Sequence, residues 1–357
     1  MSNAAPTANA ADASNAAPTA NAADASNAAP TANAAPAPPL WKRAAPFVIA
    51  MGLLTFVLAR SDLAAVRAAL SQVNAGAFVG FATLFVVALL AADTFATLMV
   101  YRPLIGKIRY RDLFTVRGAS YLPSILNHHV GQAFVTVFLA RSHAVPLSRM
   151  AGGTLLVYAS WAACLMVLGG AAMVAAGVNV AWLGAPLAVG VGYLALLAAR
   201  PSRLAEVRLF APLFEAGVRG HLSAVVSRLP HAAVVFLGTW LQFWFFGVEV
   251  PVGAALRFVP ILMVAVTLPI TPQGFGTRDL LAATLLLPFA MGENDTQKRA
   301  AIAAATASWG VVLTVIEALL GLGLWARAMR LVGAPRAAQG AREARGPSRP
   351  LGGPGGG

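Results

Sequence analysis

The chain is poor in charged residues, and above all in acidic ones. Asp, Glu, Lys and Arg make up 11% of it, whereas roughly a quarter of the residues in soluble globular domains are charged. There are 13 acidic residues against 26 Lys and Arg, which gives a net charge of +13. This composition argues against a soluble domain with an ordinary charged surface.

Cysteine is nearly absent as well. The single cysteine, Cys164, excludes an intramolecular disulfide, and its apolar surroundings favour a packing role. The adjacent His128 and His129 have no further His or Cys at zinc-site spacing. The sequence also lacks a Walker loop, a dinucleotide-binding glycine fingerprint and a Gly-x-Ser-x-Gly elbow. We therefore expect no metal, no cofactor, no catalytic residue and no enzyme activity.

Long apolar stretches dominate what is present, since 58% of the residues are hydrophobic. About 20 apolar residues suffice to cross the ~30 Å hydrocarbon core of a bilayer. We predict an all-α integral membrane protein with about six spanning helices, at 44–60, 77–100, 150–177, 182–199, 231–248 and 300–326. The membrane domain covers 41–332, with halves at about 41–178 and 179–332.

Both ends of the chain have a different composition. Residues 1–40 contain three copies of a twelve-residue unit, SNAAPTANAADA, with no large apolar side chain. Such a segment cannot bury a core, so we predict a disordered low-complexity tail. The Gly-, Pro- and Arg-rich residues 333–357 are predicted to form a second, basic disordered tail.

The positive charge favours a membrane topology rather than nucleic-acid binding. Basic residues concentrate in cytoplasmic loops of membrane proteins. With both termini inside, almost all loop Lys and Arg residues, Arg117 and Arg228 among them, fall on the cytoplasmic side. The outer side receives Arg60, Arg67, Lys298 and Arg299. This predicts a multi-pass protein of the cell inner membrane.

Two interrupted apolar segments, 118–140 and 253–290, occupy matching places in the two halves. Each has a Leu-Pro pair, then polar residues, then glycine. The charge asymmetry holds only if each segment enters and leaves by the same face, so we predict two re-entrant helical hairpins. Amphipathic linkers are predicted at 62–74 and 203–216. The halves have opposite orientations, which is the inverted-repeat plan of many secondary transporters.

The polar tips of the hairpins predict a hydrated cavity at membrane depth. A helix that starts near Thr277 would direct its N-terminal dipole into this cavity, which suits an anion. Arg278 is the first candidate for gripping a phosphate, and Arg257 is the second. The other predicted substrate-binding residues are Gly274, Gly276, Gln273, Asn127, His128 and His129.

Three acidic residues are predicted to balance charge. Asp279 or Glu317 could pair with Arg278, and intramembrane charges are usually either paired or functional. Glu317 is placed midway along the span 300–326, where proton relay is the alternative role. Asp93 is placed close enough to the cytoplasmic end of its span to reach water.

The second hairpin resembles a known family. Pro269–Leu280, PITPQGFGTRDL, is similar to the motif P…GG.G.RE of the lysylphosphatidylglycerol synthase transmembrane-region family, a group of flippase-like membrane proteins. Tyr121–Arg141 resembles the family's first motif. Gln132, Gln273 and Asp279 depart from the usual acidic residue, glycine and glutamate. The likeness covers roughly 44–330 and implies the lipid-handling half without the soluble aminoacyl transferase domain.

These observations predict a translocator that moves a polar-headed phospholipid or a lipid-linked sugar between leaflets, with membrane lipids as its partners. Two alternatives remain open at this stage. An integral-membrane lipid-modifying enzyme would use Glu317, Asp93 or His129 as acid or base. A non-transporting scaffold would instead assist a partner transferase.

Overall fold

The computed structural model describes residues 70–267 and 277–333. Within these ranges every regular element is a helix, apart from an isolated bridge between Val248 and Ala290. The all-α prediction is therefore confirmed for the described chain. The predicted span 44–60, most of the linker 62–74, both tails, and the turn with Gln273, Gly274 and Gly276 lie outside the described residues.

Four helices are long and apolar enough to cross a membrane. They are α3 (Ala75–Ile105), α7 (Leu147–Ala175), α10 (Ala211–Leu241) and α13 (Asp295–Gly333). At 1.5 Å per residue, each exceeds the ~30 Å of a hydrocarbon core. They overlap the predicted spans 77–100, 150–177, 231–248 and 300–326, so the prediction of membrane-crossing helices is supported.

α10 differs most from its prediction, because it begins at Ala211 instead of near residue 231. Its backbone is interrupted at Gly217, where φ is 57° and ψ is −172°, a conformation that glycine adopts readily. The predicted linker 203–216 is replaced by the short helix α9 (Ser202–Ala205) and by the start of α10. The linker is therefore broken into short helical segments ahead of the kink at Gly217, and its position in the membrane interface stays a prediction.

α8 (Gly184–Ala199) forms at the predicted span 182–199, but it has 16 residues. That length covers about 24 Å, less than the thickness of a hydrocarbon core. Its side chains Leu187, Val189 and Val191 are between 61% and 70% exposed, as expected of an apolar helix with a lipid-facing side. The described chain thus has four full-length candidate spans, where six were predicted for the whole chain.

The first interrupted segment folds into three consecutive short helices, α4 (Tyr110–Ala119), α5 (Tyr121–Leu126) and α6 (His128–Ser142). Asn127 separates α5 from α6, and its side chain caps α6 by accepting a hydrogen bond from the backbone N of His129 at 2.7 Å. α5 and α6 pack against each other. They approach closely at Gly131, where a Cβ atom would lie 2.8 Å from the backbone oxygen of Ser120.

The second interrupted segment contains α11 (Val252–Thr267) and α12 (Thr277–Leu285), which also contact each other. α12 begins at Thr277, as the sequence predicts. The two ends of this segment are tied together by a short antiparallel pairing. The backbone N of Glu249 donates to the backbone oxygen of Phe289 at 2.9 Å, and the backbone N of Met291 donates to the backbone oxygen of Gly247 at 2.8 Å.

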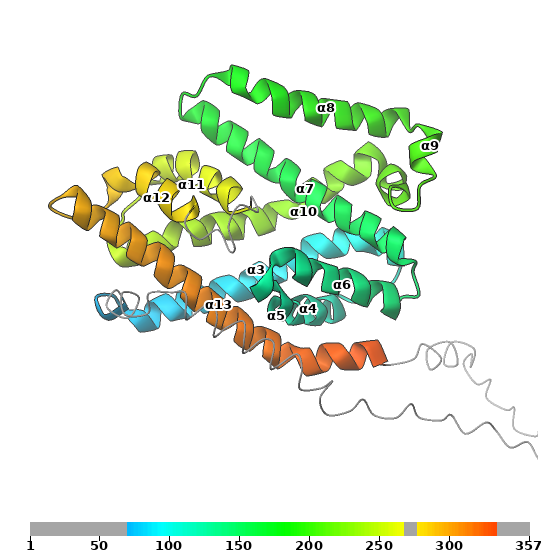
Figure 1. Cartoon of the computed structure of the whole chain (residues 1–357), viewed down its shortest axis with the longest axis horizontal. Helices are drawn as coiled ribbons and strands as arrows, with labels where there is room; N and C mark the ends of the chain where they lie inside the picture. The colour runs from blue at the N-terminus through cyan, green and yellow to red at the C-terminus, as the bar shows by residue number, and fades with distance from the viewer. Residues whose placement is uncertain (1–69, 268–276, 334–357) are drawn as a thin grey trace, which may run out of the picture. The chain divides into compact units, whose positions relative to one another are not determined.

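The long helices pack around one another, and α10 contacts both α7 and α3. α13 runs from the neighbourhood of α12 along α3 to α4 and α5 (Figure 1). An aromatic cluster joins the start of α3 to the 3₁₀ helix η2 (Gln242–Phe246), which directly follows α10, and to α13. Its members are Phe78, Phe81, Phe85, Phe245, Phe246 and Trp309. The start of α3 is therefore on the same side as the end of α10.

Candidate functional site: a buried charged cluster

Asp93 of α3 lies at the centre of a cluster of charged side chains. One carboxylate oxygen accepts a hydrogen bond from Nη1 of Arg228 in α10 at 2.5 Å. The other accepts one from Nε of Arg117 in α4. The imidazole Nδ1 of His231, one helical turn after Arg228, is 3.8 Å from Asp93 Oδ1. We call Asp93, Arg117, Arg228 and His231 the charged cluster.

The three ionised residues of the charged cluster are almost completely buried. Asp93, Arg117 and Arg228 are 6%, 7% and 2% exposed. Removing charges from water costs several kcal/mol per ion, which only close pairing offsets. Two guanidinium groups share a single carboxylate here, so one positive charge is left uncompensated within the cluster.

A polar network extends from the charged cluster into the first half of the chain. Nη1 of Arg117 donates to Oε1 of Gln132 in α6 at 2.8 Å, and Nε2 of Gln132 donates to the Tyr101 hydroxyl at 3.3 Å. The Tyr101 hydroxyl is 2.7 Å from Oγ1 of Thr154 in α7, which is 2.7 Å from Oγ1 of Thr136. The network therefore connects α3, α4, α6 and α7.

Helical spacing explains why these side chains meet. Asp93, Thr97 and Tyr101 are four residues apart on α3, so they lie on one face of the helix, and all three are buried. Arg228 and His231 are three apart on α10 and share a face in the same way. The His231 ring stands edge-on to Trp161 of α7, with centroids 4.7 Å apart.

The electrostatics keep Arg117 charged. Burial by itself lowers the pKa of a guanidinium, but the carboxylate of Asp93 and its hydrogen bond outweigh this, so the pKa of Arg117 is raised above its usual value. Tyr121, at the start of α5, stays protonated. Burial first, and then the negative charge of Glu317, raise the pKa of the Tyr121 hydroxyl well above its usual value.

Two polar atoms, one in the charged cluster and one beside it, have no hydrogen-bond partner in the described chain. They are His231 Nδ1 and Thr97 Oγ1, both buried. Buried polar atoms are nearly always satisfied in folded proteins. These two atoms are therefore available to form hydrogen bonds with a bound ligand.

The residues predicted from the sequence are distributed over different places. Asp93 is the centre of the charged cluster. Gln132, which the sequence marked only as a departure from the family motif, belongs to the polar network. Asn127, His128 and His129 are all exposed at the start of α6, and Nδ1 of His129 is 2.9 Å from the Tyr158 hydroxyl of α7.

Among the residues predicted in the second half, Glu317 lies close enough to Arg117 and Tyr121 for its charge to interact with them. Arg257 is exposed on α11. Arg278 and Asp279 belong to the first turn of α12, but their side chains lie outside what the structure describes. Glu317 is half-buried on α13, and no described cationic group lies within ion-pair distance of it.

Three expectations about charged residues were wrong. Arg117 and Arg228 were assigned to cytoplasmic loops, but both are buried and bound to Asp93. Asp93 was expected to reach water, but it is enclosed by these two arginines. The reason is the same in each case: a charge far from water is stable when opposite charges from other helices surround it.

Sequence reasoning also missed Tyr101, Tyr158 and His231 as members of the site. One signal was available, since Arg228 and His231 flank Pro230 in a stretch that continues as apolar residues. A basic residue followed directly by apolar sequence is compatible with two structures: a loop at the membrane surface, or a helix that carries the charge into the protein interior. In the described chain, no three His, Cys, Asp or Glu side chains gather as a potential metal site.

Comparison of the chain with protein-family models, with curated proteins and with solved structures finds no match. The resemblance to the flippase-like family therefore stands only on the motifs quoted above.

Proposed function

We propose that this protein translocates a phospholipid or lipid-linked sugar with an anionic head group across the membrane. The observation that carries the proposal is the excess positive charge of the charged cluster, buried among apolar helices. Ionisable groups inside a membrane domain are costly and generally mark a substrate or ion pathway. A phosphate would neutralise this excess.

The charged cluster joins the two halves of the chain. Asp93 and Arg117 belong to the half before residue 178, and Arg228 belongs to the half after it. A phosphate can accept two parallel hydrogen bonds from a guanidinium, as a carboxylate does. In the proposed mechanism the phosphate of the head group replaces Asp93 as the ion-pair partner of Arg228. The loss of this pair weakens the contact between the two halves, so that they can tilt against each other and open the site to each leaflet alternately.

Two contacts support the proposed re-entrant hairpins. The bridge between Val248 and Ala290 holds the ends of the α11–α12 segment together. Around the first hairpin, a Cβ atom on Gly153 would overlap Leu104, so the end of α3 lies directly beside the start of α7. Each segment would thus return to the face from which it entered, with Arg257 and Arg278 on the second hairpin available to the head group.

The proposed orientation places the ends of α3 and α13 and the start of α7 in the cytoplasm. Removing Arg117 and Arg228 from the loop charges leaves most remaining Lys and Arg residues on that side. The contact of Phe78 with Phe245 and Phe246 supports the same arrangement. It joins the start of α3 to the end of α10, and both belong to the outer side in this topology.

The test is a lipid-scrambling assay with the full chain reconstituted in vesicles. Fluorescent phosphatidylglycerol in the outer leaflet is bleached by an impermeant reductant, and the rate at which inner-leaflet lipid becomes accessible is measured. The variant Arg228→Gln removes the excess charge but keeps the Asp93–Arg117 pair. We expect it to slow translocation about 10- to 100-fold, because a charge-assisted hydrogen bond contributes about 1.5–3 kcal/mol.

The matched control is Arg149→Gln. It breaks another Arg–carboxylate pair, Arg149 with Glu215, whose side chains are 36% and 41% exposed. We expect the control to keep the wild-type rate. If Arg228→Gln also keeps that rate, the charged cluster does not carry lipid. Mass spectrometry of the recovered lipid identifies the enzyme alternative, for which a new chemical species would appear.

A further inference from the structure

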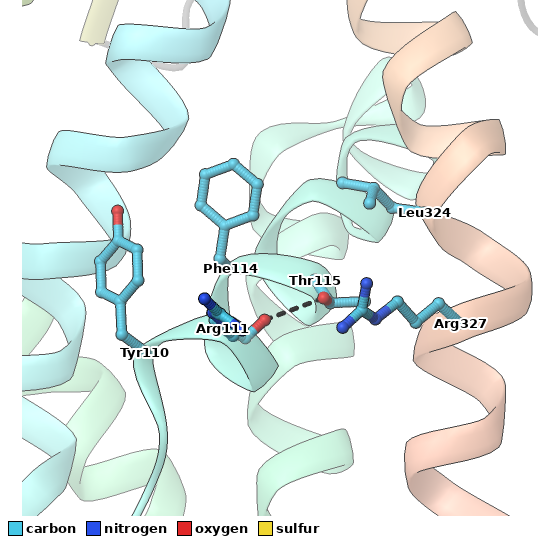
Figure 2. A pocket seen from close by; sticks show the side chains of 6 residues that line it. All are labelled: Tyr110, Arg111, Phe114, Thr115, Leu324 and Arg327. Atoms are coloured by element: carbon cyan, nitrogen blue, oxygen red, sulfur yellow. Dashed lines mark hydrogen bonds between the residues drawn. The ribbon is translucent and has the colours of Figure 1, made fainter.

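A shallow pocket of about 350 Å³ lies between α4 and the end of α13, apart from the charged cluster. Figure 2 shows the Arg327 side chain extending from α13 toward Thr115 and Arg111 of α4. The residues that line the pocket are Tyr110, Arg111, Phe114, Thr115, Leu324 and Arg327.

The two arginines of the pocket carry free positive charge. Arg111 and Arg327 are exposed, and neither makes an ion pair with a described acidic side chain. The adjacent Arg109 is different, since its Nε donates to Asp112 at 2.9 Å. The pocket thus has two unpaired guanidinium groups from two helices, a geometry that suits a phosphate.

The remaining wall of the pocket is apolar and held in place. Phe114 and Leu324 are half-buried, and the rings of Tyr110 and Phe114 are 6.0 Å apart. The Tyr110 hydroxyl donates to Ala91 O on α3 at 2.9 Å, which fixes the ring. A Cβ atom at Gly118 would overlap Leu324, so the glycine lets α13 lie close to α4. This contact holds α4 close to α13, and these two helices carry the two arginines that line the pocket.

The position along α13 corresponds to the membrane–water interface. The uncharged stretch of this helix after Glu317 ends at Ala326, directly before Arg327, and Arg330 follows one helical turn later. Arginine at such a level can extend toward lipid head groups while its aliphatic stem stays among apolar atoms. Phe114 and Leu324 then face the depth at which the glycerol and upper acyl groups of a lipid lie.

From this arrangement we propose that the pocket binds the phosphate of an anionic phospholipid of the adjacent leaflet. In the proposed orientation this is the cytoplasmic leaflet. A lipid satisfies both parts of the pocket, because its phosphate reaches Arg111 and Arg327 while its glycerol and upper chains contact Phe114 and Leu324. Free phosphate would use only the arginines. The site does not depend on transport and would exist in a protein that moves no lipid.

The experiment measures binding directly. The full chain in detergent is mixed with dioleoyl phosphatidylglycerol or with dioleoyl phosphatidylcholine, and bound lipid is counted by native mass spectrometry over a concentration series. The test variant is the double substitution Arg111→Gln and Arg327→Gln. The control is the double substitution Arg109→Gln and Arg330→Gln, which removes two charges outside the pocket, one from the N-cap residue of α4 and one from α13. Size-exclusion profiles check that all the variants remain folded.

We expect wild type and control to retain phosphatidylglycerol in preference to phosphatidylcholine. The pocket variant should bind phosphatidylglycerol about 10- to 30-fold more weakly. Each Lys or Arg near an anionic lipid surface strengthens binding about fivefold, and this variant loses two of them. Equal losses in both double variants would reduce the effect to general surface charge and overturn the proposal. Full competition by millimolar inorganic phosphate would also overturn it, since the site would then be one for the free ion.

Discussion

Substituting Asp93 by Asn tests the charged cluster most directly. Asparagine has nearly the same size, but it leaves Arg117 and Arg228 without a counter-charge at 7% and 2% exposure. Breaking a buried ion pair by removing one partner costs about 3–5 kcal/mol. Because two guanidinium groups lose the same carboxylate here, we expect the upper part of that range.

The loss converts into a measurable shift of the thermal midpoint. For domains of about 150–250 residues, 1 kcal/mol corresponds to about 2–4 °C, so a loss of about 4–5 kcal/mol in Asp93→Asn should lower the midpoint by about 8–20 °C. The assay heats the full-length protein in detergent and measures the folded fraction by size-exclusion chromatography. Arg149→Gln is again the control, since its exposed pair with Glu215 contributes about 0–1 kcal/mol.

Two results would refute this reasoning. If Asp93→Asn lowers the midpoint no more than Arg149→Gln does, then water reaches the carboxylate and the charged cluster is not desolvated. The double variant Asp93→Asn, Arg228→Gln removes one of the two stranded charges, so it should recover part of the stability. Additive losses would mean that Asp93 and Arg228 do not interact.

Two further predictions concern the packing around the site. Gly131→Ala should destabilise the protein by about 1–3 kcal/mol, because the new Cβ atom would press on the backbone oxygen of Ser120. The control Gly323→Ala has open space around the new Cβ atom, so it should be neutral or stabilising. Equal effects of the two substitutions in the same melting assay would contradict the close approach of α5 and α6. Tyr101→Phe removes a hydroxyl that bonds Thr154 at 2.7 Å, so it should cost about 1–3 kcal/mol; an unchanged midpoint would mean that this part of the polar network adds no stability.

The long apolar helices were largely predictable from the sequence. High hydropathy marked 77–100, 150–177 and 300–326. The helices α3 and α13 extend beyond both predicted ends, whereas α7 starts three residues earlier and ends two residues earlier than predicted. The start of α10 was not predictable in this way, because His221 and Arg228 lower the local hydropathy although both are buried. Hydropathy reports the average environment of a residue type, and it fails where tertiary pairing overrides that average.

The charged cluster shows the same limit at the level of the site. Asp93 and Arg228 are 135 residues apart in the chain, and nothing local to either residue identifies the other. Local patterns did mark Asn127, and they marked the Pro- and Gly-broken segment in which Gln132 also lies. What the sequence could not supply was the arrangement of α3, α4 and α10 that brings the opposite charges together.

The pairing of Asp93 with Arg228 has a consequence for how the chain enters the bilayer during synthesis. An arginine near the middle of a helix opposes insertion by about 2.5–3.5 kcal/mol, and α10 has the lowest mean hydropathy of the four long helices, 1.4. α3 emerges from the ribosome first and carries the only carboxylate that the described chain offers to Arg228. We therefore expect α3 to stabilise α10 in the membrane, and α10 expressed alone to integrate less completely than α10 that follows α3.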